Sequence, residues 1–362
     1  MVIATLEPNA EPIDEPSPQT IRHVSGLTVL VPAYNEGASI LDTIRSLQNQ
    51  TRPVDRIIVI DDCSTDDTAA VARSTGVDVL RPPQNTGSKA GAQNYALQFV
   101  ETDLCMAIDA DTIVAPDAIE KIVAELEGSN AAAACGYVIP RHVNTIWERG
   151  RYVEYLFAFT FFKQIQDVYE KPLISSGCFS VYRSAILKEM GGWSRRTLAE
   201  DIDLTWTLYE AGHKVRFVPD AVCYPIEPET FHFMKCQLTR WSHGFLQNLI
   251  VHWRRVLDVP FLRSAVTIML WDSIIASILY LTVIPVFSVL ISPVFLLGYV
   301  IDLPAVAVPV LWTAVKRRET GKALLSLLCF PVLRIVNGWF MLKAAWYEFV
   351  LRRSFKVYVK GH

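Results

Sequence analysis

Two carboxylates separated by one residue, Asp109 and Asp111, follow the apolar run of residues 104–108. Carboxylates this close repel each other, and burying an unpaired charge is costly, so the pair must stay solvated or be neutralised. A hard divalent cation such as Mg²⁺ or Mn²⁺ takes one or two protein carboxylates and leaves its other positions to water and substrate phosphates. The pair therefore predicts a metal site that faces a diphosphate, and a solvated turn after a strand is the alternative.

A second acidic pair, Asp61 and Asp62, ends the apolar run of residues 56–60, and the run that begins at Leu27 ends in the polar stretch "PAYNE". In open α/β sheets, ligands bind beyond the carboxyl ends of the parallel strands. If these runs are neighbouring strands, three distant segments meet at one edge of a sheet and form one site. Capping of the following helix is the alternative role for Asp61 and Asp62.

The elements that would position these residues follow from the hydrophobic pattern. Short apolar runs alternate with segments of helical period through the first part of the chain. The expected strands are 27–36, 56–60, 77–83 and 104–110, and the expected helices are 38–50, 66–76 and about 88–100. This alternation predicts right-handed βαβ units and an α/β fold with a parallel sheet.

The pattern changes in the second half of the chain. Residues 147–165 are rich in aromatic side chains with interleaved basic residues, and residues 233–257 are amphipathic. Both segments are predicted to be helices that lie at a membrane interface or under the core. Between them we expect a helix with an acidic start at Glu200 and Asp201.

Residues 264–315 contain only two charged side chains, Asp272 and Asp302. A stretch of this length can cross a bilayer twice, because each helical span needs about 20 apolar residues. Basic residues flank both ends, so the positive-inside rule predicts a transmembrane hairpin with both ends in the cytoplasm. The apolar segment 323–350 is interrupted by cations and a proline, and it could be a third span, a re-entrant segment or an interfacial helix. Residues 351–362 are expected to form a basic cytoplasmic tail.

Composition narrows the class of protein. The chain has 362 residues, 51% of them hydrophobic, and a formal net charge of -3, which argues against a nucleic-acid partner. Its seven cysteines show no CxxC spacing and are predicted to be free thiols in a reduced compartment. Residues 1–26 are rich in Pro and Glu and are expected to be a disordered tail rather than a signal peptide. We therefore expect a multi-pass protein of the cell (inner) membrane, with a catalytic domain at residues 27–257 in the cytoplasm.

Six short motifs occur in one order along the chain: "VPAYNE" (31–36), "DDCSTD" (61–66), "NTGSKAGAQN" (85–94), "DAD" (109–111), "AED" (199–201) and "QLTRW" (237–241). In these motifs, residues 27–257 resemble the membrane-bound family-2 glycosyltransferases with a QxxRW motif, the branch that includes hyaluronan, chitin and cellulose synthases and ceramide glucosyltransferase. The resemblance implies a GT-A fold, which is a nucleotide-diphospho-sugar transferase domain with a mostly parallel sheet flanked by helices. It also implies C-terminal transmembrane helices, a UDP-sugar donor, and Mg²⁺ or Mn²⁺ as the cofactor.

The resemblance assigns one set of residues to the donor. The residues that would bind the nucleotide sugar are Pro32, Tyr34, Glu36, Asp61, Asp62, Lys89, Asp109 and Arg240. Tyr34 and Asp62 would hold the uracil, and Asp109 and Asp111 would hold the metal, with Asp111 as a direct ligand. Arg240 can meet the pyrophosphate with its planar guanidinium group.

The resemblance assigns a second set to the acceptor and to catalysis. Asp201 would be the general base, because an inverting transfer needs a carboxylate on the face of the sugar opposite the leaving UDP. The residues that would bind the acceptor are Ser176, Gly177, Cys178, Gln237, Arg240 and Trp241. The alternatives are close strand packing for the stretch at 176–178, and a core tryptophan beside an interfacial arginine for Trp241 and Arg240.

The acceptor itself stays open at this point. The favoured function is extension of a β-linked polysaccharide by one chain or by a homo-oligomer, and the alternative is a short-chain or non-processive transfer to a membrane lipid. Synthases of this branch usually carry more membrane helices than this chain shows, and the family often has Gly where Cys63 stands and Thr where Ala199 stands. A catalytically silent scaffold is disfavoured, because the metal carboxylates and Asp201 are all present.

Overall fold

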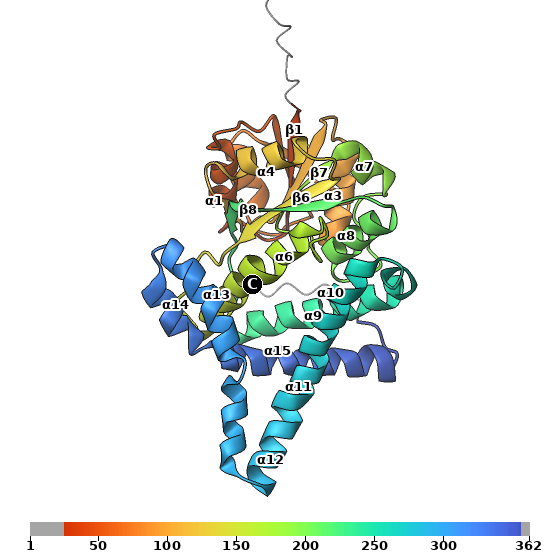
Figure 1. The fold of residues 1–362 in the computed structure, drawn as a ribbon. Coiled ribbons are helices and arrows are strands. Elements are labelled where there is room, and N and C mark those ends of the chain that lie inside the picture. The colour runs from red at the N-terminus through yellow and green to blue at the C-terminus, as the bar shows by residue number, and fades with distance from the viewer. Residues whose placement is uncertain (1–24, 356–362) are drawn as a thin grey trace, which may run out of the picture.

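One mixed sheet of eight strands organises the catalytic part in the computed structural model, which describes residues 25–355 (Figure 1). In spatial order the strands are β3 (Asp78–Leu80), β2 (Arg56–Asp61), β1 (Leu27–Ala33), β4 (Leu104–Ile108), β7 (Phe179–Arg183), β6 (Ala133–Val138), β8 (Val215–Tyr224) and β5 (Ile113–Val114). The strands from β3 to β4 run parallel, β7 is antiparallel to both of its neighbours, and β5 is antiparallel to β8. The α/β expectation is confirmed, with a parallel first half and a mixed second half. The predicted tail at residues 1–26 and the end of the tail at 351–362 lie almost wholly outside the described residues.

The register brings the predicted strand ends together. Ala33 at the end of β1 pairs with Asp61 at the end of β2, and on its other side β1 pairs with β4. The segments that carry "PAYNE", the Asp61–Asp62 pair and the "DAD" triplet therefore leave the sheet at one edge, as expected from the order of the strands.

Helices cover both faces of the sheet. On one face lie α1 (Ile40–Gln48), α2 (Thr68–Ser74) and α4 (Ala118–Glu127), and on the other lie α3 (Lys89–Leu97), α7 (Ser184–Glu189) and α8 (Glu200–Glu210). The spacing of Ile40, Ile44 and Leu47 puts these three side chains on one side of α1, where all are fully buried. Each contributes about 1.5–3 kcal/mol by leaving water.

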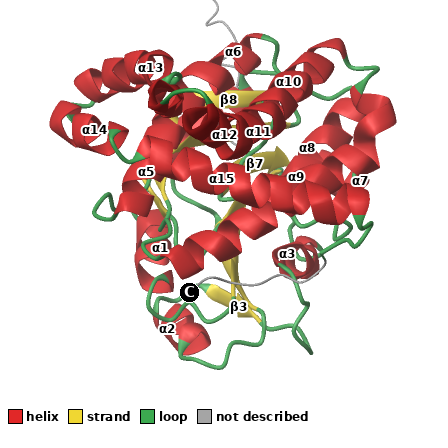
Figure 2. Ribbon diagram, turned by 90° about the horizontal axis from the view of Figure 1, so that it is seen from below, coloured by secondary structure: helices red, strands yellow, loops and turns green. Residues whose placement is uncertain are grey.

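A layer of long helices lies under the sheet. It consists of α5 (Ile146–Phe157), η1 (Ala158–Phe162), α6 (Lys163–Val168), α9 (Phe231–Val256), α15 (Phe330–Ala345) and η5 (Trp346–Val350). Figure 2 shows α5, α15 and α9 from below, and α15 contacts both of the other two. The predicted segments 147–165 and 233–257 are thus helical and form part of this layer.

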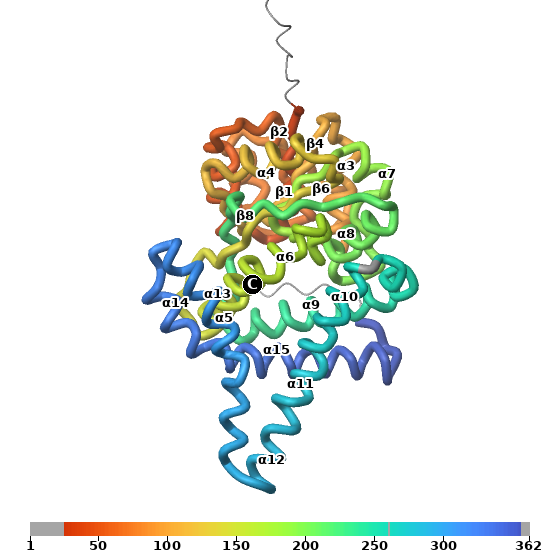
Figure 3. The backbone as a smooth tube through the Cα atoms, viewed as in Figure 1, coloured from red at the N-terminus to blue at the C-terminus, as the bar shows by residue number. Residues whose placement is uncertain are grey.

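An apolar hairpin projects from this layer, away from the sheet (Figures 1 and 3). One arm is α10 (Pro260–Leu270), η2 (Trp271–Ile275), α11 (Ala276–Ile278), η3 (Leu279–Val283) and α12 (Ile284–Leu290), and the other is η4 (Pro293–Val300) and α13 (Leu303–Lys316). The two arms, Phe261–Leu290 and Pro293–Lys316, are long and apolar enough to cross a membrane. After them, α14 (Thr320–Leu327) and the helix Phe330–Val350 form a bent pair with an angle of 53°. In Figure 1, α15 runs crosswise to the hairpin.

Candidate active site

A cavity of about 1090 Å³ lies between the carboxyl ends of the parallel strands and the helices of the lower layer. It gathers nearly every site residue that the sequence predicts. Those that line it are Pro32, Tyr34, Glu36, Asp62, Lys89, Asp109, Asp111, Ser176, Gly177, Cys178, Asp201, Gln237, Arg240 and Trp241. Segments from both halves of the domain thus line one cavity.

Asp61 is the predicted residue that the structure places outside this lining. Its side chain is fully buried and accepts a hydrogen bond from Arg81 at 2.6 Å and another from the backbone N–H of Ser64 at 3.0 Å. Its neighbour Asp62 does line the cavity and accepts two hydrogen bonds from Thr86, at 2.7 Å and 2.9 Å. Asp62 therefore fixes the loop that leads to α3 through its hydrogen bonds to Thr86. Asp61 instead fixes the end of β2 through its hydrogen bonds to Arg81 and Ser64.

The two carboxylates of the "DAD" triplet have different surroundings. Asp109 forms an ion pair with Lys89. Within the described residues no ion pair reaches Asp111, whose oxygen accepts a hydrogen bond from Thr112 at 3.2 Å. Burial raises the pKa of Asp111 to about 8, and the nearby carboxylates of Asp109 and Glu36 add to the rise. Among residues 25–355, no positively charged side chain forms an ion pair with Asp111.

A divalent cation bound at Asp109 and Asp111 would supply a positive charge beside Asp111. No group of three or more His, Cys, Asp or Glu side chains in the described part of the chain could hold a metal by itself. A cation at Asp109 and Asp111 would relieve the repulsion between them and leave its other positions to phosphate oxygens, which is the usual way in which Mg²⁺ is held. The residues present therefore suit a metal that arrives with a nucleotide diphosphate.

Lys89 connects three segments of the site. It begins α3, whose N-cap Ser88 accepts a hydrogen bond from the N–H of Gly91 at 3.1 Å. Besides Asp109, its ammonium group donates to the carbonyl oxygen of Gly177 at 2.9 Å and lies 3.7 Å from a carboxylate oxygen of Glu200. The ammonium group of Lys89 thus lies between the predicted metal carboxylates and the start of α8.

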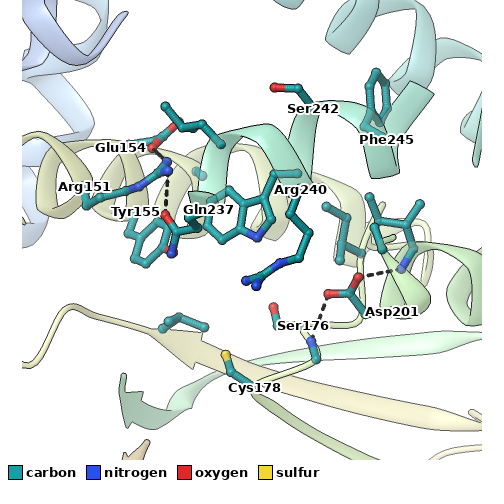
Figure 4. A pocket seen from close by; sticks show the side chains of 18 of the residues that line it. Arg151, Glu154, Tyr155, Ser176, Cys178, Asp201, Gln237, Arg240, Ser242 and Phe245 are labelled. Atoms are coloured by element: carbon teal, nitrogen blue, oxygen red, sulfur yellow. Dashed lines mark hydrogen bonds and ion pairs between the residues drawn. The ribbon is translucent and has the colours of Figure 1, made fainter. Parts of the chain in front are cut away.

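Asp201 lies in the first turn of α8, and two backbone N–H groups fix its carboxylate (Figure 4). The N–H of Gly177 donates to Oδ2 at 3.1 Å, and the N–H of Ile202 donates to Oδ1 at 2.9 Å. A Cβ atom on Gly177 would lie 3.3 Å from Oδ2 and 3.1 Å from the Lys89 nitrogen, so glycine allows this close approach. An ionised carboxylate offers about four lone-pair positions, so Asp201 can still accept a proton from a ligand in the cavity.

Gln237, Arg240 and Trp241 of the "QLTRW" motif all face the cavity from α9, as their spacing predicts. Figure 4 shows the guanidinium group of Arg240 directed into the space beside Asp201 and Ser176. Gln237 is buried and donates to Glu227 at 3.1 Å. Trp241 is 37% exposed, so one part of its ring is open to a ligand.

Arg151 on α5 is a residue of this site that sequence reasoning missed. It is 1% exposed, donates to the side-chain oxygen of Gln237 at 2.8 Å, and lies 4.5 Å from the centre of the Trp241 ring. Its charge is balanced by Glu154 and by Glu227, whose oxygen is 3.9 Å away. Burial raises the pKa of Glu227, and Arg151 opposes that rise. Arg151 therefore positions two residues of the motif, whereas the sequence predicted only a helix at a membrane interface or under the core and gave no role to this arginine.

The stretch at 176–178 is held by another missed residue, Lys163. This lysine is 7% exposed, donates to the hydroxyl of Ser176 at 2.8 Å, and lies 4.5 Å from the centre of the Phe159 ring. A buried cation among aromatic rings is stabilised by their negative faces. The signal in the sequence was a single lysine within an aromatic helix, and nothing in its spacing pointed to Ser176.

The sheet order and the position of the cavity define a GT-A-like domain, and two solved structures confirm the fold. The mannosyltransferase PcManGT from Pyrobaculum calidifontis, in complex with GDP-Man and Mn²⁺, matches with a TM-score of 0.60 and 21% identity over 93% of this chain and 90% of that chain. S. aureus TarS 1-349, in complex with UDP, matches with a TM-score of 0.51 and 16% identity over 89% of this chain and 91% of that chain.

Sequence comparison identifies the domain. Residues 28–191 match the family described as "Glycosyl transferase family 2", so this chain contains a glycosyltransferase family 2 domain. Poly-beta-1,6-N-acetyl-D-glucosamine synthases from Staphylococcus epidermidis and Staphylococcus aureus are 27% identical over 228 residues, which is 62% of this chain. The match spans 55% of the length of these relatives.

Proposed function

We propose that this protein is an inverting glycosyltransferase that moves a sugar from a UDP-sugar to a growing β-linked polysaccharide at the cytoplasmic face of the cell membrane. The observation that carries the proposal is the arrangement of Asp201 and Arg240 in one cavity with the Lys89–Asp109 pair. A base, a phosphate-binding cation and a metal carboxylate are the groups that such a transfer needs.

In the proposed reaction, the acceptor hydroxyl attacks C1 of the donor sugar while Asp201 takes the proton from that hydroxyl. The bond between C1 and the diphosphate oxygen breaks, and UDP leaves with the electron pair. Arg240 and Lys89 bind the charge that develops on the diphosphate. Mg²⁺ or Mn²⁺, held by Asp109 and Asp111, would stabilise the same charge as a Lewis acid.

The comparisons support the donor and the acceptor to different degrees. The TarS complex contains UDP and the mannosyltransferase complex contains GDP-Man with Mn²⁺, so domains of this fold bind both kinds of nucleotide. The named relatives are synthases of a β-linked polymer, which favours a polysaccharide over a lipid as the acceptor. Tyr34 and Asp62 both line the cavity, and we propose that they hold the uracil.

We also propose that the hairpin anchors the domain in the membrane, with the helix Phe330–Val350 at the interface. The two hairpin arms expose large apolar side chains such as Leu290 and Val294, which are 75% and 67% exposed. Tryptophans on the crosswise helix, Trp339 and Trp346, are 59% and 56% exposed, and exposed tryptophan is typical of the membrane–water interface.

The donor half of the proposal is tested by calorimetric titration of the purified protein with UDP and GDP, with and without Mn²⁺. We expect UDP to bind more tightly than GDP, and Mn²⁺ to strengthen binding at least tenfold. Asp111→Asn should remove the effect of Mn²⁺, whereas Asp117→Asn, a control whose half-exposed carboxylate pairs with Lys121, should not. Metal-independent binding of UDP would contradict the proposed metal site.

A further inference from the structure

The loop of residues 197–199, which leads into α8, carries Asp201 at its far end. Ala199 stands at the N-cap position of α8, where its methyl group can accept no hydrogen bond from the free N–H groups of the helix. Leu198 and Ala199 line the cavity together with Asp201. A shift of this loop would therefore move the proposed base relative to the acceptor.

Two neighbouring amide side chains on α9 hold this loop. The side-chain oxygen of Gln247 accepts a hydrogen bond from the backbone N–H of Leu198 at 3.0 Å. The side-chain nitrogen of Asn248 donates to the carbonyl oxygen of Ala199 at 3.0 Å and to the hydroxyl of Thr197 at 3.2 Å. Gln247 is 6% exposed and Asn248 is fully buried, so both amides are shielded from water.

Gln247 also contacts the end of the helix Phe330–Val350. Its side-chain nitrogen donates to a carboxylate oxygen of Glu348 at 2.9 Å and to the backbone carbonyl of Phe355 at 2.8 Å. The Glu348 carboxylate is buried and lies 2.7 Å from Nδ1 of His243, one turn before Gln247 on α9. Because an amide carries both an acceptor and donors, Gln247 joins the helix that follows the hairpin to the loop before the base.

The carboxylate of Glu348 determines which way the amide of Gln247 faces. An ionised carboxylate accepts hydrogen bonds and cannot donate them, so the amide nitrogen must face Glu348 and the amide oxygen must face Leu198. The flipped amide would set its nitrogen against the N–H of Leu198 and its oxygen against the carboxylate. The contact with Glu348 therefore keeps an acceptor in front of the Leu198 N–H.

We propose that Glu348 and Gln247 are positioning residues for the sugar transfer. Glu348 orients the amide of Gln247, and this amide holds the loop that starts α8 and carries Asp201. Neither of the two side chains lines the cavity, so both act through the loop. This inference rests on the proposed function, because it takes Asp201 as the base. It adds that the helix after the hairpin helps to align that base.

The test changes the pair in the purified full-length protein in detergent. Gln247→Glu sets a second carboxylate against Glu348 and removes the amide donor. A base displaced by about 1 Å can lower a rate by about 10²-fold, so we expect kcat to fall about tenfold or more. The affinity for UDP with Mn²⁺, measured by calorimetry, should stay unchanged. Turnover is measured with UDP-N-acetylglucosamine and UDP-glucose and is expressed per UDP-binding site, so unfolded protein does not count.

Two further variants separate positioning from a general loss of structure. Gln247→Glu combined with Glu348→Gln restores one carboxylate and one amide to the pair, so it should recover most of the lost turnover. Gln98→Glu is the matched control, because it makes the same change at an exposed glutamine at the end of α3. This control should turn over as the wild type does.

Amide hydrogen exchange tests the positioning without relying on activity. The peptide that contains Leu198 should exchange about tenfold faster in Gln247→Glu than in the wild type, whereas peptides from β1 and β4 should exchange as before. If Gln247→Glu does not fold, Glu348→Gln takes its place. That variant no longer fixes the orientation of the Gln247 amide, so it should raise the exchange of the same peptide and lower kcat at unchanged UDP affinity.

The positioning role is overturned if exchange at Leu198 is unchanged, if turnover stays at the wild-type level, or if UDP affinity falls as far as kcat. Failure of the double variant to recover turnover would also contradict it. Failure of the proposed function has a different outcome: the wild type binds no UDP or transfers no sugar, while exchange at Leu198 still responds to Gln247→Glu.

Discussion

Removal of Arg151 gives the sharpest check of how the acceptor side is built. Arg151 is buried with Glu227 nearby, and Glu227 is itself 4% exposed. Arg151→Met therefore leaves a buried carboxylate without its cation, and breaking a buried pair in this way costs about 3–5 kcal/mol. For a protein of this size we expect the midpoint of thermal unfolding to fall by about 10 °C.

The pH dependence of the stability of Arg151→Met shows whether the buried Glu227 carboxylate causes the loss of stability. Burial already raises the pKa of Glu227, and loss of Arg151 removes the interaction that opposes the rise. A carboxyl group whose pKa is higher in the folded than in the unfolded state stabilises the fold below the unfolded pKa of about 4.3, and this stabilisation is lost as pH rises through the folded pKa. Arg151→Met should therefore lose stability as pH rises above about 4.3 and through the raised pKa of Glu227 in the folded state, by up to about 1.4 kcal/mol for each pH unit.

The double variant provides the control. Arg151→Met with Glu227→Gln keeps only the partly exposed carboxylate of Glu154 and no longer has a buried carboxylate without its cation. It should therefore be more stable than Arg151→Met alone at pH 8 and should show a much smaller decline with pH. The assay is thermal unfolding in detergent followed by tryptophan fluorescence, at several pH values. The reasoning is refuted if the single and double variants unfold at the same temperature at pH 8.

Two further predictions concern the helices around Asp201. Gly244→Ala on α9 would place a Cβ atom 2.7 Å from the Cβ of Ala199, just before Asp201, so we expect sugar turnover to fall at least tenfold with unchanged UDP affinity. Gly321→Ala, where a Cβ meets nothing within 4 Å, should leave both unchanged, and equal effects at the two glycines would contradict the packing argument. Burial lowers the pKa of His252, but hydrogen bonds to Asp203 and Glu210 outweigh it and raise the pKa above its usual value. His252→Asn removes the interactions of the charged imidazole with these carboxylates, so it should destabilise the protein by about 1–2 kcal/mol at pH 6. That stabilisation is present below pH 6.5 and is lost as pH rises through the folded pKa, so thermal unfolding of the two proteins should converge at high pH.

The parallel half of the sheet could be predicted from the sequence, because each of its strands is a short apolar run that ends in polar residues. The expected strands 27–36, 56–60, 77–83 and 104–110 correspond to β1, β2, β3 and β4. In contrast, α4, β5 and β6 were not expected. The strand Ala133–Val138 begins with two alanines after an alanine run, so it shows no period-2 pattern, and its single β-branched residue is the last one, Val138.

Most of the predicted site residues line the cavity, and they were found from strand ends, from residues three and four apart on one helix, and from the family resemblance. The sequence does not show which side chains of a segment face the protein interior and which stay exposed. The aromatic segment 147–165 turns Arg151 and Lys163 inward and leaves Phe161 and Ile165 exposed, and only the packing of α5 and α6 against the sheet decides this. The sequence also does not distinguish Asp61, which is buried beside Arg81, from Asp62, which lines the cavity.

The central claim is that this cavity makes a polymer from a UDP-sugar with Asp201 as the base. To test this claim directly, membranes that contain the protein are incubated with radiolabelled UDP-sugars and Mg²⁺ or Mn²⁺. Label in polymer is then separated from label that extracts into organic solvent. We predict label in polymer from one UDP-sugar, and none above background with Asp201→Asn. Label confined to the organic extract would make the product a glycolipid, and equal labelling by wild type and Asp201→Asn would contradict the proposed reaction.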